Sequence, residues 1–181
     1  MIFTPTPLTG SYEITLEPRV DSRGWFARVF CKDEFAQIGH TREWVQLNHS
    51  FTVTRGAIRG LHFQHPPFSE IKMVRCIAGS VFDVMIDLRK GSDTFLRWYG
   101  TQLSADNKRM LYIPAGFAHG FQTLADNCEL LYHHSEYYKP AAEAGIRYND
   151  LMIGIEWPLP LAEISERDSA HPLLTPQFKG I

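Results

Sequence analysis

The chain has 181 residues, of which 44% are hydrophobic and 21% charged, and its formal net charge at pH 7 is -2. This length predicts a single domain over residues 1–181 with a sizeable core, and the composition excludes intrinsic disorder for most of the chain. The 18 basic and 20 acidic residues are not grouped by sign, which argues against a nucleic-acid or membrane-surface partner.

The cysteines and the amino terminus indicate where the protein works. Cys31, Cys76 and Cys128 are an odd number at wide spacing, which predicts free thiols in a reducing compartment. The first residues lack the basic start and long apolar run of a signal peptide, and no apolar run approaches the roughly 20 residues that span a bilayer. We therefore expect a cytoplasmic protein.

Short apolar runs punctuated by proline and glycine predict an all-β fold. Their β-branched and aromatic residues predict strands, in chain order, at 12–16, 25–31, 44–54, 57–64, 71–78, 80–88, 98–103, 110–113, 120–124 and 129–135. Helical periodicity is confined to 32–38 and a turn at 161–164. Strands spaced by roughly 8 to 12 residues predict a β-sandwich or a jelly-roll barrel, and the pattern does not choose between the two.

The predicted strand 57–64 contains the first residue suited to chemistry, His62. Because side chains alternate along a strand, His62 and Gln64 are predicted on one face, and Arg59, Leu61 and Phe63 on the other. A single strand histidine is more often structural than functional, so this pattern alone assigns no role to His62.

The histidines also raise the question of a metal site, since imidazole is a common transition-metal ligand. A mononuclear site needs three or four ligands, but the residue two positions after His62 is Gln64, which is a weak ligand. His133 and His134 point to opposite faces of their strand and do not chelate together. We therefore expect no metal.

Six blocks of sequence carry a resemblance to a known family. In chain order they are residues 59–64, 72–76, 81–84, 87–92, 113–121 and 165–168. Together they resemble the dTDP-4-dehydrorhamnose 3,5-epimerase family of cupins, over nearly the whole chain. The resemblance implies a metal-free jelly-roll homodimer that uses no cofactor. It also implies an isomerase that epimerises a nucleoside-diphosphate 4-keto-6-deoxyhexose, in deoxysugar synthesis for surface polysaccharide such as lipopolysaccharide O-antigen.

The resemblance also implies the catalytic residues. His62 is the general base, Asp168 is its carboxylate partner, and Tyr132 donates a proton from the opposite face of the sugar. Lys72 is the candidate cation for the enolate oxygen at C4. These residue types suit the chemistry, because removing a proton beside a ketone needs a base that titrates near neutrality.

A second set of residues is implied in substrate binding. It comprises Arg23 and Arg59 for the diphosphate, Phe26 and Arg28 from the segment after Arg23, Gln46 and Asn48 near the nucleotide, His119 beside the sugar or phosphate, and Glu143 from the loop after Tyr138. Guanidinium groups bind phosphate oxygens in pairs, which explains how a chain of net charge -2 binds an anion.

The chain departs from the family pattern at three places. Arg28 stands where the family usually has a glutamate near the nucleotide, and the smaller departures are residues 68–71 and His133-His134. Arginine has only donors and therefore matches cytosine better than thymine, which makes a CDP-linked sugar an alternative to the dTDP-linked one. The competing interpretations of Arg28 are a solvated strand residue or a diphosphate contact.

Two other functional classes stay open beside the epimerase. One is a metal-dependent cupin enzyme such as a dioxygenase, which Gln64 argues against. The other is a non-catalytic sugar-binding cupin, which is disfavoured because His62, Lys72, Tyr132 and Asp168 are all present. The sequence does not separate epimerisation at C3, at C5 or at both carbons.

Overall fold

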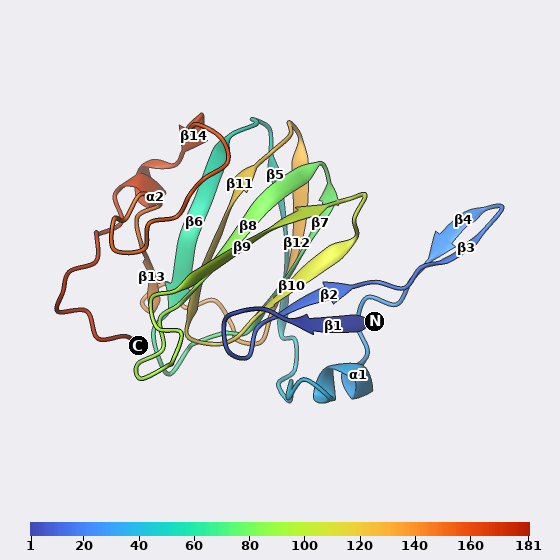
Figure 1. Cartoon of the computed structure of the whole chain (residues 1–181), viewed down its shortest axis with the longest axis horizontal. Helices are drawn as coiled ribbons and strands as arrows, with labels where there is room; N and C mark the ends of the chain where they lie inside the picture. Colours follow the sequence, from blue (N-terminus) through green and yellow to red (C-terminus); the bar gives the residue numbers. More distant parts are fainter.

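A computed structural model describes residues 1–181 as two antiparallel sheets with a separate hairpin (Figure 1). The first sheet contains, in spatial order, β1 (Ile2–Pro5), β2 (Tyr12–Thr15), β10 (Arg109–Ile113), β7 (Lys72–Ala78), β12 (Cys128–His134) and β5 (Gln46–Thr52). The second contains β13 (Glu143–Gly145), β6 (Ala57–Gln64), β11 (Phe117–Thr123), β8 (Ser80–Asp87) and β9 (Trp98–Ser104), with β14 (Glu163–Ile164) parallel to β6. The hairpin is β3 (Arg19–Asp21) and β4 (Gly24–Phe26), and the helices are α1 (Lys32–Ala36) and α2 (Glu166–Ser169). The all-β prediction is confirmed.

Two of the predicted elements are wrong. The strand expected at 25–31 ends at Phe26, because β4 pairs only with β3 and the chain beyond it packs Ala27 and Val29 against the body. The turn expected at 161–164 contains β14, whose Ile164 pairs with Ile58 of β6. Elements β1, β3, β13 and α2 were not expected, since runs of three or four residues carry almost no periodicity.

Three apolar clusters hold the layers together. Alternate residues of each strand face the space between the sheets, where Val74, Met85 and Leu130 are fully buried. The residues between them cover the outer faces: Val84 and others lie beneath the carboxyl-terminal segment, and Phe35 of α1 lies against the first sheet. Burial on both faces explains why β8 reads as an almost continuous apolar run.

A β-bulge in β6 changes the predicted alternation. His119 of β11 pairs with His62, but Phe121 pairs with Arg59, so β6 carries one extra residue at this point. Gly60 takes a φ of +116°, and a Cβ there would lie 2.7 Å from the Cα of Gly120. The bulge turns Arg59 to the same side as His62, so the prediction that they face opposite ways is wrong.

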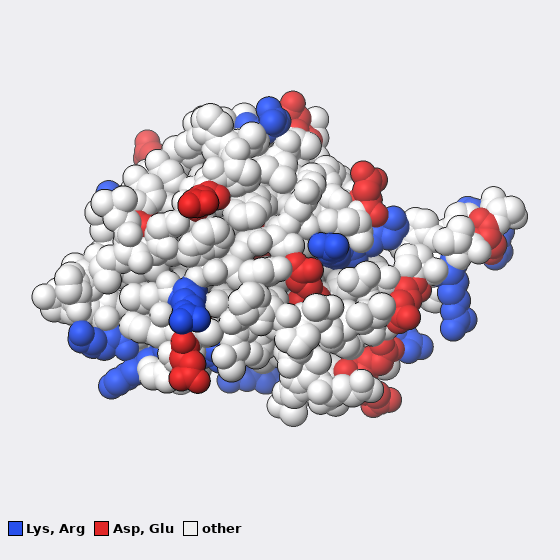
Figure 2. All heavy atoms as spheres, viewed as in Figure 1, with Lys and Arg blue, Asp and Glu red and all other residues white.

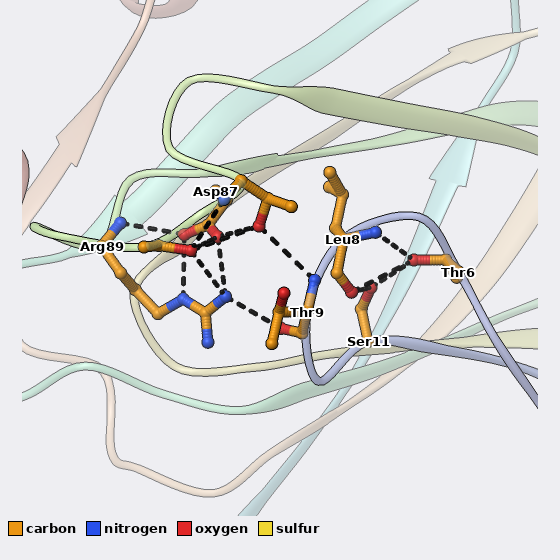
Figure 3. A network of polar contacts seen from close by, with 8 residues as sticks. Thr6, Leu8, Thr9, Ser11, Asp87 and Arg89 are labelled. Atoms are coloured by element: carbon orange, nitrogen blue, oxygen red, sulfur yellow. Dashed lines mark hydrogen bonds and ion pairs between the residues drawn. The ribbon is translucent and has the colours of Figure 1, made fainter.

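A buried polar network joins the amino-terminal loop to the β8–β9 turn (Figure 3). The Asp87 carboxylate accepts hydrogen bonds from Arg89 Nη2 at 2.7 Å and from Thr94 Oγ1 at 2.6 Å, and Ser92 donates to the same oxygen. Arg89 also donates to the Thr9 carbonyl at 2.8 Å. Burial opposes ionisation of Asp87, but these donors lower its pKa to about 2. The ionised Asp87 and its donors therefore connect the amino-terminal loop to the β8–β9 turn.

On the face shown in Figure 2, acidic and basic residues are interspersed and most of the surface is uncharged. No broad patch of one sign is visible there, in keeping with the expectation from the sequence. None of the helices has the length and apolar character needed to cross a membrane.

Candidate active site

A cleft of about 700 Å³ opens between the two sheets. Nine of the predicted site residues line it: Gln46, Asn48, Arg59, His62, Lys72, His119, Tyr132, Glu143 and Asp168. Strands β5, β7 and β12 form one wall, and β6, β11 and α2 form the other. Residues more than a hundred positions apart in sequence are thereby brought together.

His62 and Asp168 form a hydrogen-bonded pair in the β6 wall. His62 Nε2 lies 2.8 Å from Asp168 Oδ1, and the backbone N–H of Gly60 donates to Oδ2 at 3.0 Å. Asp168 is held in place because Ser165 caps α2 by accepting a hydrogen bond from the Asp168 backbone. Burial would raise the pKa of Asp168, but the bonds from His62 and Gly60 lower it well below its ordinary value. The ionised carboxylate orients His62 and leaves Nδ1 as the ring nitrogen that can accept a proton.

Arg167 adjoins this pair and was not expected in the site. Its Nη2 lies 3.2 Å from His62 Nε2, and its Nη1 lies 3.1 Å from Glu143 Oε2. Nε2 cannot donate to Asp168 and accept from Arg167 at the same time, so these two contacts exclude each other. The position next to Asp168 in sequence was the only signal for Arg167.

Tyr132 lies on β12 in the wall opposite His62. Its hydroxyl is 2.9 Å from Ser50 Oγ of β5, and burial raises the pKa of the phenol above its ordinary value. The hydroxyl therefore keeps its proton at neutral pH and is available as a donor. Lys72, at the start of β7, places Nζ 3.3 Å from the carbonyl oxygen of His62 and so lies between the two walls.

His119, which lines the cleft, forms a second histidine–aspartate pair. His119 Nε2 is 2.9 Å from Asp83 Oδ1 on the neighbouring strand β8, and both side chains are buried. Asp83 was not among the predicted site residues. A signal was present, because Asp83 is a lone carboxylate in the middle of an apolar strand, where an acid is rarely buried without a partner.

The remaining cleft residues are held by local hydrogen bonds. Arg59 donates from Nε to Thr52 Oγ1 at 2.9 Å, and Gln46 donates to Asn48 Oδ1 at 3.1 Å. Glu143 of β13 accepts a hydrogen bond from the Tyr138 hydroxyl at 2.7 Å. The arginine and the amides give the cleft several donors suited to phosphate and to a heterocyclic base.

Three predicted binding residues lie outside the cleft of their own chain. Arg23 and Phe26 belong to the β3–β4 hairpin, which projects from the body at the right of Figure 1, and both are exposed. Arg23 pairs with Asp21 in the same hairpin. Arg28 pairs with Glu34 of α1 at 2.7 Å. Within a single chain, these three residues do not lie near the nine predicted site residues that line the cleft.

One group of side chains has the composition of a metal site. His62, Asp168 and His171 place ligand atoms within 4.8 Å of one another. However, both oxygens of Asp168 already accept hydrogen bonds, and the Arg167 guanidinium lies 3.4 Å from one of them. A fixed positive charge at this distance opposes a metal cation. The donor set fits a hydrogen-bonded base better than a metal centre.

Comparison with known proteins decides the family. The model of the dTDP-4-dehydrorhamnose 3,5-epimerase family matches residues 5–176. The chain belongs to this family. Its all-β sandwich is the cupin-type jelly roll of these epimerases, and the chain is accordingly an isomerase. A dioxygenase or a non-catalytic binding protein is not favoured.

Individual relatives agree with this assignment. The dTDP-4-dehydrorhamnose 3,5-epimerase of Salmonella typhimurium is 48% identical over 165 residues, which cover 89% of this chain and 90% of the relative. A dTDP-4-dehydrorhamnose 3-epimerase of Streptomyces niveus is 40% identical, covering 96% and 84%. The crystal structure of the Bacillus anthracis 3,5-epimerase with TDP and pyrophosphate bound has a TM-score of 0.92 at 38% identity, covering 96% and 99%.

Proposed function

We propose that this family member epimerises a dTDP-linked 4-keto-6-deoxyhexose without a cofactor. The observation that carries the proposal is the arrangement of His62 and Tyr132 on opposite walls of one cleft, with Lys72 between them. A base and an acid on opposite sides of a sugar ring are what inversion at a carbon requires. Family membership supports the substrate class.

In the proposed mechanism, His62 removes the proton from a carbon next to the C4 ketone. The electron pair of the broken C–H bond moves onto the ketone oxygen, and the resulting enolate is stabilised by the Lys72 ammonium. Tyr132 then donates its proton to the opposite face of the same carbon, and the C4 ketone reforms. Solvent returns a proton to Tyr132, and His62 releases its proton. The Asp168 carboxylate stabilises the imidazolium formed in the first step.

The proposed nucleotide is dTDP. The Bacillus anthracis relative was crystallised with TDP, whereas the argument for CDP depends on Arg28 reaching the base. In this chain the Arg28 guanidinium is engaged by Glu34 instead. Competition binding of dTDP and CDP tests the choice: tighter binding of dTDP supports this proposal, and tighter binding of CDP restores the alternative.

The proposed assembly is a homodimer in which the β3–β4 hairpin completes the cleft of the second subunit. The hairpin exposes Val20, Trp25 and Phe26, and strand β5 at the sheet edge exposes Leu47 and Phe51. Apolar side chains in such number on a projecting hairpin and an edge strand are typical of an interface. This arrangement would bring Arg23 to a diphosphate bound in the partner's cleft.

One experiment tests the reaction and counts the inverted carbons. The protein is incubated with dTDP-4-keto-6-deoxyglucose in D₂O, and NMR reports which carbons take up deuterium. Uptake at C3 and C5 identifies a 3,5-epimerase, and uptake at one carbon a single-carbon epimerase, as the two kinds of relatives allow. No uptake at either carbon contradicts the proposal. The cytoplasmic location and the role in O-antigen synthesis stay predictions.

A further inference from the structure

Two side chains outside the predicted site residues, Glu70 and His134, meet in the wall of the cleft. Glu70 precedes β7 and His134 ends β12, and His134 Nδ1 lies 2.7 Å from Glu70 Oε2. The other oxygen, Oε1, lies 3.2 Å from Lys72 Nζ. All three side chains are at least 88% shielded from solvent, with exposed fractions of 10%, 12% and 9%. Glu70 and His134 are therefore structurally coupled to each other and to the proposed catalytic lysine.

Hydrogen-bond direction gives this group a single consistent arrangement. Gln46 Nε2 donates to Asn48 Oδ1 at 3.1 Å, and Asn48 Nδ2 then faces His134 Nε2 at 3.4 Å. Because the Asn48 amide is a donor there, His134 Nε2 must accept, and its proton must be on Nδ1. Nδ1–H is the donor that Glu70 Oε2 needs. The His134 tautomer with its proton on Nδ1 thus satisfies all the hydrogen bonds that connect Gln46, Asn48, His134, Glu70 and Lys72.

The arrangement also fixes how Lys72 is used. An ammonium group has three N–H donors, and two of them are directed to Glu70 Oε1 and to the His62 carbonyl. The third is left for an oxygen atom in the cleft. Burial would raise the pKa of Glu70, but Lys72 and His134 lower it, so the carboxylate stays charged beside the lysine. His134 in turn packs against the Tyr132 ring, with centroids 6.2 Å apart.

We propose that Glu70 and His134 are positioning residues that hold Lys72 in the orientation needed to stabilise the enolate oxygen. This inference rests on the proposed function of the cleft. His134 fixes the carboxylate of Glu70, and Glu70 fixes the ammonium of Lys72. Neither residue needs to touch the substrate for this role.

The test compares Glu70→Gln, His134→Leu and His134→Asn in the deuterium-uptake assay. If the glutamine oxygen stays with Lys72, its N–H₂ group faces His134 Nδ1, which forces the other tautomer and opposes the Asn48 donor. If the amide turns the other way, its N–H₂ group faces the Lys72 ammonium, which also has only donors. We expect Glu70→Gln and His134→Leu each to lower kcat about 10- to 100-fold, as small misplacements of catalytic groups do, with little change in KM. Asparagine can place its amide nitrogen where Nδ1 was, so His134→Asn should retain most of the activity. The double variant Glu70→Gln/His134→Leu should lose little more than either single variant.

A matched control is Glu13→Gln, which neutralises a carboxylate of similar exposure outside the cleft. Glu13 accepts a hydrogen bond from Tyr99 at 2.7 Å and has an exposed fraction of 16%. This variant should keep the wild-type kcat. The inference would be overturned if the wild-type protein is active and the Glu70→Gln variant has the same kcat. It would also be overturned if the double variant loses as much kcat as the two single variants combined. An inactive wild-type protein contradicts the proposed function instead.

A second measurement does not depend on whether the variants fold. Nitrogen-15 NMR of the histidine rings in the wild-type protein reports which nitrogen of His134 carries the proton. The inference requires the proton on Nδ1. A proton on Nε2 would break the chain of donors between Asn48 and Glu70 and overturn it.

Discussion

Replacing Asp168 by asparagine changes one atom and should disable the base. The two carboxylate oxygens of Asp168 have different partners: Oδ2 accepts from the rigid backbone N–H of Gly60, and Oδ1 faces His62 Nε2. An asparagine has only one oxygen. If that oxygen stays with Gly60, the N–H₂ group faces Nε2, which must then accept a hydrogen bond. The proton moves to Nδ1, and His62 loses the lone pair that takes the substrate proton.

The size of the effect follows from these two contacts. Turning the amide the other way restores the His62 contact but leaves the buried Gly60 N–H without an acceptor, at a cost of about 1 to 3 kcal/mol. This cost lowers the population with the active tautomer by about 5- to 150-fold. The variant also lacks the charge that stabilises the imidazolium. Together we expect kcat to fall by about 10² to 10⁴-fold, the range typical of acid–base groups.

The assay is deuterium uptake from D₂O under saturating substrate, with thermal unfolding followed in parallel. A suitable control is Asp150→Asn, since Asp150 is another buried carboxylate that accepts hydrogen bonds from backbone N–H groups of Met152 and Leu174 away from the cleft. The control should lose stability and keep its kcat. A folded Asp168→Asn protein with a kcat near wild type would refute the assignment of His62 and Asp168 as base and partner.

Two further predictions concern the acid and the fold. In the Tyr132→Phe variant, deuterium uptake from the His62 side should continue while epimerisation falls, because no proton donor remains on the opposite wall of the cleft. An equal loss of deuterium exchange and of epimerisation would show that Tyr132 only positions the sugar. Asp87→Asn should remove charged hydrogen bonds worth roughly 2 to 3 kcal/mol and lower the melting temperature at pH 7 by about 4 to 12 °C. Because the folded-state pKa of Asp87 is lowered from 3.8 to about 2, its contribution is present above about pH 4 and is lost as pH falls toward 2. The difference in melting temperature between the wild-type protein and the variant should shrink over that pH interval. A constant difference would contradict this role of the Asp87 carboxylate.

Local patterns predicted the elements that bury a regular apolar face. The strand expected at 57–64 has the same bounds as β6, and 80–88 differs from β8 by one residue, because both carry several buried apolar side chains. The sequence pattern gave a wrong prediction where a single residue changes the course of a strand. The alternation rule put Arg59 on the wrong face, because it assumes a regular strand and β6 has a bulge at Gly60 opposite β11.

The candidate site was predictable only through the family resemblance. His62 and Asp168 are 106 residues apart, and no local rule relates residues at that separation. The same limit explains why Arg167 was missed, since only the fold places His62 beside it. Asp83 carried a local signal as a lone acid in an apolar strand, but that signal does not show that His119 is its partner. Arg23 lies in the exposed β3–β4 hairpin, and Arg28 follows the hairpin and pairs with Glu34, so neither pattern nor the fold of the single chain fixes where those side chains act.

The contact between Gly60 and Gly120 limits how this active site can evolve. Each glycine occupies the space that the other's side chain would need: a Cβ on Gly60 would meet Gly120, and a Cβ on Gly120 would lie 2.6 Å from the Arg59 carbonyl oxygen. No single substitution at either position is sterically free, and a change at one is not relieved by a change at the other. The neighbouring strands that carry His62 and His119 therefore do not tolerate a side chain at either glycine where the two backbones come closest. New substrate preferences have to arise elsewhere, through β5, the loop after β12 and the projecting hairpin, where side chains can be exchanged without moving the base.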